Sequence, residues 1–145
     1  MQTDFAHNDA TGVVIPFVNP FQAAKKRFER HNETFYEKLV AANYSYSPMA
    51  EYEELEETML ATPARSLADV AYKVELSRWT LDEIGGADVD ELNLLDRALT
   101  ALKERKVKTA IAALNAVLTG DYEYEFAYAG AIAALGDLRR MEARP

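Results

Sequence analysis

The chain has 145 residues, of which 49% are hydrophobic and 28% charged, and its formal net charge is −8. This is about the length of one domain, and the composition is that of a folded globular protein. The chain contains no cysteine, which excludes disulfide frameworks, thiolate zinc sites and cysteine nucleophiles. So acidic a chain is also a poor candidate for direct binding of nucleic acid.

The first segment, residues 1–18, shows no helical periodicity. Its stretch VVIPFVNP is β-branched and aromatic and is interrupted by proline, which predicts an extended arm lying on an apolar surface. No basic region followed by an apolar run marks a secretory signal, and no apolar run is long enough to span a membrane. We therefore expect a cytoplasmic protein without membrane partners.

The first helix is predicted to start at Asn19 and Pro20, a capping side chain followed by proline at the first helical position. Positions at spacings of three and four then form one stripe on a helix of about 20 residues. The stripe consists of Phe21, Ala24, Phe28, His31, Phe35, Leu39 and Ala42.

The second helix is predicted to begin after Ser47 and Pro48 and to stop at Thr62, because a residue before proline is pushed out of the helical region. Ser66 caps a third helix, with Asp69 three residues later in a loose capping box. The corner between these helices therefore has a backbone role. The predicted inward residues are Met49, Tyr52, Leu55, Met59 and Leu60 in the second helix and Leu67, Val70, Ala71, Val74, Trp79 and Leu81 in the third.

The remainder of the chain is also helical in its periodicity. Gly85 and Gly86 end the third helix and Asp88 caps the next. The stretch KERKVK is either a tight turn or the charged middle of one long helix. The apolar positions are Val89, Leu92, Leu95, Leu99, Leu102, Val107, Ala110, Ile111, Leu114, Val117 and Leu118, and the last helix carries Ala129, Gly130, Ala133 and Gly136 for close approach of a neighbour. The predicted fold is all-α, a single-domain bundle of five or six helices over 19–145 behind an extended N-terminal arm, 1–18.

Five glutamates crowd the second helix, namely Glu51, Glu53, Glu54, Glu56 and Glu57. Paired carboxylates can perform acid–base chemistry or bind metal, but a charge-rich helix is more often a solvated face. A dinuclear metal site in a bundle needs Glu-x-x-His pairs, and neither His7 nor His31 has a glutamate three residues before it. No nucleophile elbow or phosphate-binding glycine loop is present either. We expect no catalytic residue, metal or cofactor.

His31 is the candidate ligand-binding or buried polar residue. It lies on the apolar stripe of the first helix, where it could serve as a base or a ligand. The alternative is a core histidine hydrogen-bonded to a backbone group or a carboxylate, which burial would keep neutral.

The candidate interaction surface combines tyrosines near turns with the acidic helix. Tyrosine brings a large area and a polar tip to interfaces at low entropy cost, although such side chains can equally line the core. The residues of this candidate surface are Tyr44, Tyr46, Glu51, Glu53, Glu54, Glu57, Tyr122 and Tyr124.

One section carries a resemblance. The corner residues Thr62, Pro63, Ala64, Ser66, Leu67, Ala68, Val70, Ala71 and Lys73 follow a pattern of a Thr-Pro-Ala corner, a hydroxyl residue, Leu-Ala and a Val-Ala-x-Lys helix. In this pattern residues 51–103 resemble a class of short, uncharacterised helical proteins of α-proteobacteria and their prophages. Asp69 stands where glycine is expected and Arg65 where a small hydroxyl residue is usual. The resemblance implies a helix–corner–helix unit and a bacterial or phage setting, and no activity.

We therefore expect a non-catalytic protein-interaction or regulatory helical protein associated with phage or prophage, and not an enzyme. Its partner is a protein, basic if charged, since residues 45–96 carry 13 acidic and 3 basic side chains. A homodimer through the N-terminal arm or the last helix is a further expected association. The alternatives are an acidic inhibitor that mimics nucleic acid on a basic protein surface, and a small-ligand binder or enzyme that uses His31.

Overall fold

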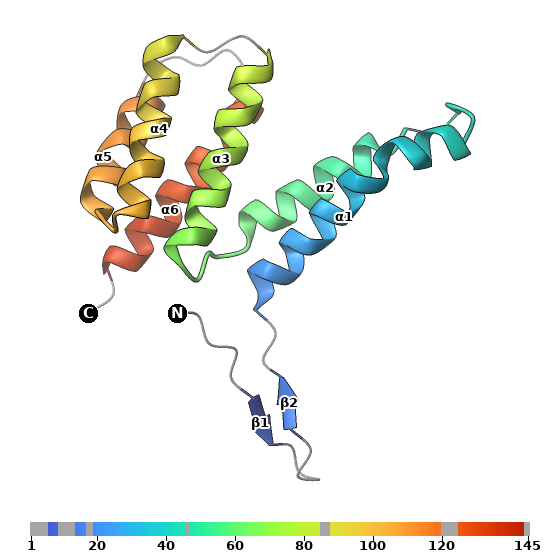
Figure 1. Ribbon diagram of the computed structural model, residues 1–145, viewed down its shortest axis with the longest axis horizontal. Helices are drawn as coiled ribbons and strands as arrows, with labels where there is room; N and C mark the ends of the chain where they lie inside the picture. The colour runs from blue at the N-terminus through green and yellow to red at the C-terminus, as the bar shows by residue number, and fades with distance from the viewer. Residues whose placement is uncertain are drawn as a thin grey trace. The chain divides into compact units, whose positions relative to one another are not determined.

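The computed structural model describes residues 6–8, 14–16, 19–45, 47–84, 88–119 and 125–143, and six α-helices run through them (Figure 1). This confirms the all-α prediction. The helices are α1 (Pro20–Ala41), α2 (Met49–Ala61), α3 (Leu67–Ile84), α4 (Val89–Lys103), α5 (Val107–Leu118) and α6 (Ala129–Ala143), and a 3₁₀ turn, η1 (Glu125–Tyr128), precedes α6. None of them combines the length and the apolar character needed to cross a membrane.

The chain divides into two compact units, Met1–Thr62 and Pro63–Pro145. The boundary falls at the Thr62–Pro63 corner. The division into an arm over 1–18 and one bundle over 19–145 stays a prediction.

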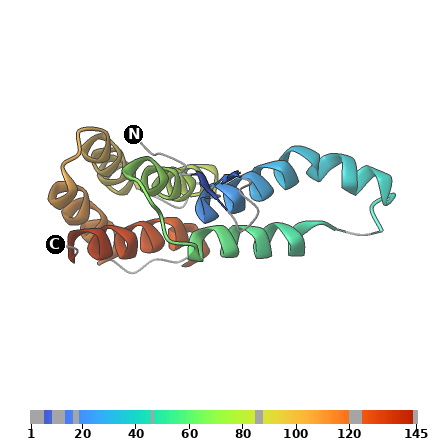
Figure 2. The same ribbon diagram turned by 90° about the horizontal axis from the view of Figure 1, so that it is seen from below.

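In the first unit, α1 and α2 lie antiparallel and pack against each other (Figure 2). The predicted start of α1 is confirmed, since Asn19 Oδ1 accepts hydrogen bonds from the backbone N–H groups of Phe21 and Gln22 at 3.0 and 3.3 Å. Backbone from the segment predicted as an arm forms two short antiparallel strands, β1 (Ala6–Asn8) and β2 (Val14–Pro16), in which His7 lies opposite Ile15.

The predicted stripe of α1 is buried only in its first half. Phe21, Ala24, Phe28 and His31 are buried, whereas Phe35, Leu39 and Ala42 are half-exposed. In α2 only Met59 is buried, and Met49, which was predicted to face inward, is 47% exposed. Two helices alone cannot surround an apolar stripe, so the half of this hairpin next to its connection remains partly uncovered.

In the second unit, α3, α4, α5 and α6 form a closed four-helix arrangement in which each helix contacts the next and α6 returns to α3 (Figure 1). Their core contains Val70, Val74, Leu81, Leu95, Leu102, Ala110, Leu114, Val117, Ala131, Ala134 and Leu138, among others. This is the usual way for amphipathic helices to bury their apolar faces.

The start signals of α3 and α4 are confirmed. Ser66 Oγ accepts the Asp69 N–H at 3.1 Å, and Asp88 Oδ1 accepts the Glu91 N–H at 2.8 Å. Because the Asp69 carboxylate accepts the Arg65 N–H at 3.1 Å, the polar residues of this corner do have backbone roles, as predicted.

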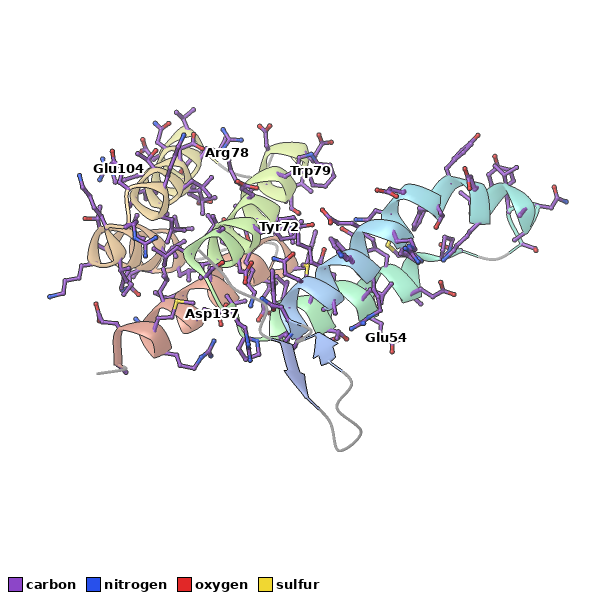
Figure 3. The ribbon with its side chains drawn as sticks, turned by 60° about the horizontal axis from the view of Figure 1, so that its bottom comes forward. Glu54, Tyr72, Arg78, Trp79, Glu104 and Asp137 are labelled. Carbon is purple, nitrogen blue, oxygen red and sulfur yellow. The ribbon has the colours of Figure 1, made fainter. Side chains whose placement is uncertain are left out.

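The ambiguous KERKVK stretch is a turn. Helix α4 ends at Lys103 and α5 starts at Val107, and Arg105 between them has a φ of 62°. Two positions predicted to face inward do not. Val89 is 71% exposed and Trp79 is 59% exposed, and Figure 3 shows Trp79 on the side of α3 away from α4. The predicted end of the third helix at Gly85 and Gly86 lies outside the described residues.

Candidate functional site

A groove of about 620 Å³ runs between α1 and α2 and is the best candidate for a binding site in the first unit. We call its walls the groove face. Helix α1 contributes Arg27, Arg30, His31, Thr34 and Lys38, and α2 contributes Glu51, Glu54 and Leu55. The α1 wall is therefore cationic and the α2 wall anionic, with Leu55 between them.

His31 lies in this groove, where the residue is only 4% exposed. Its Nε2 donates a hydrogen bond to Glu51 Oε2 at 3.1 Å, and Lys38 Nζ lies 3.5 Å from the same oxygen. The glutamate side chain is about half exposed. The sequence left two roles open for His31, a base or ligand and a buried polar residue, and the observed contact is that of a buried histidine bonded to a carboxylate.

The other ring nitrogen limits what His31 can do. His31 Nδ1 is buried and has no hydrogen-bond partner among the described residues. A general base must reach the proton that it removes, but Nε2 is committed to Glu51 and Nδ1 is closed to solvent. In this geometry His31 shapes the groove and fixes Glu51, and it has no nitrogen available for a substrate.

An aromatic cluster adjoins the groove through His31. The ring centroids of Phe28 and Phe35 lie 5.3 and 6.5 Å from that of Tyr52, and His31 meets Phe35 edge-on at 5.9 Å. Burial raises the pKa of Tyr52 to about 12, helped by the charge of Glu56 and a hydrogen bond to it. Burial likewise raises the pKa of Glu56, opposed by the Tyr52 hydrogen bond and reinforced by the charge of Glu53.

The predicted interaction surface is only partly described. Tyr46, Tyr122 and Tyr124 lie outside the described residues. The glutamates do not share one side of α2: Glu51 and Glu54 line the groove, whereas Glu53 and Glu57 are exposed elsewhere on the helix. At about 100° per residue, positions 53 and 57 lie about 160° and about 120° around α2 from position 51.

Tyr44, another predicted interaction residue, is 63% exposed and has a φ of 60° just after α1. A non-glycine residue in this left-handed region is strained. Three further apolar residues at this end of the hairpin are exposed, Tyr36 by 68%, Met49 by 47% and Val40 by 46%. We call Tyr36, Val40, Tyr44 and Met49 the tip patch. Tyr36 and Val40 were not among the residues predicted from the sequence, although their spacing of four residues outside the predicted stripe was a usable signal.

The second unit contains a buried charge cluster that the sequence did not predict. Lys73 Nζ donates a hydrogen bond to Asp137 Oδ2 at 2.7 Å, and both side chains are buried. Arg140 donates to the other carboxylate oxygen of Asp137. Burial lowers the pKa of Lys73, opposed mainly by its hydrogen bond to Asp137 and by the charge of that residue. The groove between α3 and α4, about 580 Å³, is lined by other residues. The Lys73–Asp137 pair therefore lies outside that groove, and it joins α3 to α6.

Metal chemistry finds no support in the described part of the chain. No three histidine, aspartate or glutamate side chains there gather closely enough to hold an ion. Comparisons of the chain with protein-family models, with curated proteins and with solved structures found no match.

Proposed function

We propose that the chain is a non-catalytic protein-interaction or regulatory protein that binds its partner through the tip patch. The observation that carries this proposal is the exposure of four large apolar side chains at one end of the α1–α2 hairpin. Apolar and aromatic side chains that cluster on a surface are typical of protein interfaces.

Strain at the connection supports the same assignment. Asn43 and Tyr44 both have positive φ, 52° and 60°. Asparagine tolerates this region, but tyrosine does so at a cost. An exposed tyrosine at such a position contributes little to the fold, whereas it presents a large ring to a partner.

The setting that we propose is the one expected from the sequence. We propose a cytoplasmic, phage- or prophage-associated protein whose partner is a basic protein, because of the −10 balance of residues 45–96. The two alternatives are less well supported. The carboxylates of α2 point to more than one side, which does not favour a row of phosphate-like charges. Neither nitrogen of His31 is available to a ligand or substrate, since Nε2 is bonded to Glu51 and Nδ1 is closed to solvent, which does not favour a small-ligand binder or enzyme that uses His31.

The test is site-specific photo-cross-linking in the source cell. A photoreactive phenylalanine at position 36 should trap one dominant partner protein, whereas the same residue at position 26 should not. Lys26 is also exposed on α1 but lies far from the tip patch, so it is a matched control. Two results would rule out the tip patch as the interface. One is equal cross-linking from positions 36 and 26, and the other is a product from position 36 that is undiminished in the V40S variant.

A further inference from the structure

The charges of the groove face are complementary to one another across the groove. Arg27 and Arg30 on the α1 wall and Glu54 on the α2 wall make no ion pair with any described residue, and all three are exposed. Lys38 and Glu51 already contact each other at 3.5 Å. The open end of the groove therefore presents unpaired cations on one helix and an unpaired anion on the other.

The same asymmetry extends over the whole hairpin. Helix α1 carries five basic and three acidic residues, and α2 carries five acidic residues and no basic one. A partner that fits this face must place negative charge against α1 and positive charge against α2. A second copy of the hairpin satisfies that requirement when its α2 faces α1 and its α1 faces α2.

We propose that the groove face binds the groove face of a second copy of this chain. A two-fold axis running parallel to the helices places each α1 against the α2 of the other copy, so that neighbouring helices are all antiparallel and opposite in charge. The two α1 helices, like the two α2 helices, then lie diagonally. The result is a four-helix bundle with an isologous interface.

This axis also fixes which residues meet. Rotation about an axis parallel to the helices keeps every residue at its own height along them. Arg27, Arg30 and Glu54 line one groove, so Arg27 and Arg30 of one copy meet Glu54 of the other. The alternative two-fold axis, perpendicular to the helices, would stack α1 on α1 and α2 on α2, and the acidic α2 helices would repel each other.

The charges select the partner and its orientation, because exposed ion pairs by themselves contribute little to affinity. Apolar contact comes from Leu55 and from the aliphatic stems of the arginine side chains, which can cover apolar surface while the guanidinium groups stay in water. The tip patch is on a different side of the hairpin: at about 100° per residue, Tyr36 and Val40 lie well away from Arg30 and Thr34 around α1. Self-association therefore leaves the proposed partner surface open.

The first experiment measures mass in solution by sedimentation equilibrium. The native chain should form dimers, and the R27E/R30E and E54K/T58K variants should each be monomeric. A 1:1 mixture of the two variants should restore a dimer, since acidic α1 then meets basic α2 and the reverse. The K26E and E57K variants change charge on other sides of the same helices and should remain dimeric.

The second experiment tests the orientation by cross-linking. Because the chain has no cysteine, R30C and E54C each introduce a single thiol. A short bifunctional thiol reagent should link position 30 of one copy to position 54 of the other at least tenfold faster than it links two copies of R30C.

Three results would overturn the proposal. They are a monomeric native chain at the highest soluble concentration, a mixture of reversed variants that stays monomeric, and a cross-linking preference for 30 to 30. A monomer whose Arg30 position cross-links to a different protein would assign the groove face to an unrelated partner. None of these results bears on the tip patch, because its test measures cross-linking from position 36 to a partner protein and not to a second copy of the chain.

Discussion

Lys73 and Asp137, separated by 64 positions in the sequence, form a fully buried ion pair with a 2.7 Å hydrogen bond between α3 and α6. Figure 3 shows Asp137 where α6 approaches α3. Removing Lys73 leaves the buried Asp137 carboxylate with Arg140 as its remaining ion-pair partner, and removing Asp137 leaves the buried Lys73 ammonium without its partner. Replacing both members with apolar residues takes both charges out of the core.

The K73M variant should therefore lose about 3–5 kcal/mol of unfolding free energy. The K73M/D137L double variant should be more stable than the sum of the two single changes predicts, because the desolvation of both charges is removed together. Urea denaturation of the four proteins in this cycle measures the coupling. Additive losses would mean that the two side chains do not depend on each other.

Gly130 and Gly136 provide a matched pair on α6. A Cβ on Gly130 would lie 2.1 Å from the Lys73 carbonyl oxygen and 2.9 Å from Ser77 Oγ, whereas a Cβ on Gly136 would meet nothing within 4 Å. We expect G130A to lose about 1–3 kcal/mol through overpacking. G136A should gain about 1 kcal/mol from helix propensity. Thermal or urea unfolding of both variants should show changes of opposite sign, and two gains would contradict the close approach of α6 to α3.

His31 carries a buried nitrogen without a partner, so its replacement should cost little. In the H31L variant the unpaired Nδ1 disappears, and Glu51 stays half exposed and close to Lys38. H31L removes one partner of the hydrogen bond, and the Glu51 carboxylate that remains is hydrated, so no buried polar group is left unsatisfied. We therefore expect an unfolding free energy within about 1 kcal/mol of the native value. A loss well above this would show that His31 has a further role in the fold.

Tyr52 should lose its hydroxyl proton at a higher pH than an ordinary tyrosine. Its pKa is raised to about 12 from 10.0 by burial and by Glu56. Because the folded-state pKa lies above the unfolded one, the stabilisation is fully present below pH 10 and is lost as pH rises through 12. The difference in tyrosinate absorbance between the native chain and Y52F measures this midpoint. E56Q, which removes the neighbouring charge, should lower it, and an unchanged midpoint in E56Q would mean that Glu56 makes no contribution.

Local signals predicted most of the fold. Asn19, Ser66 and Asp88 start α1, α3 and α4 as expected, since capping depends on residues only two or three positions apart. The sequence did not decide between a turn and a continuous helix at KERKVK. Arg105 adopts the left-handed backbone conformation of the turn, and there is no glycine there to indicate it.

Exposure was harder to predict than helicity. Trp79 and Val89 are apolar but lie outside the core, because a helix that packs on two neighbours shows them only part of its surface. Lys73 differs from Trp79 and Val89 in the opposite sense, because it is a charged residue that lies in the core. Its burial depends on Asp137, which no short-range pattern connects to it. The groove face was likewise hidden, since it needs the pairing of α1 with α2.

Gly130 and Asp137 lie seven residues apart on α6, and both meet the same residue of α3. The backbone carbonyl of Lys73 occupies the space where Gly130 has no side chain. The ammonium group of Lys73 binds Asp137. A displacement of α6 by one turn would bring the side chain of another α6 residue against that carbonyl. It would also separate Lys73 from Asp137 and leave each buried charge without the other. The longitudinal register of the two helices is thus fixed twice, once by steric exclusion and once by electrostatics, through a single lysine.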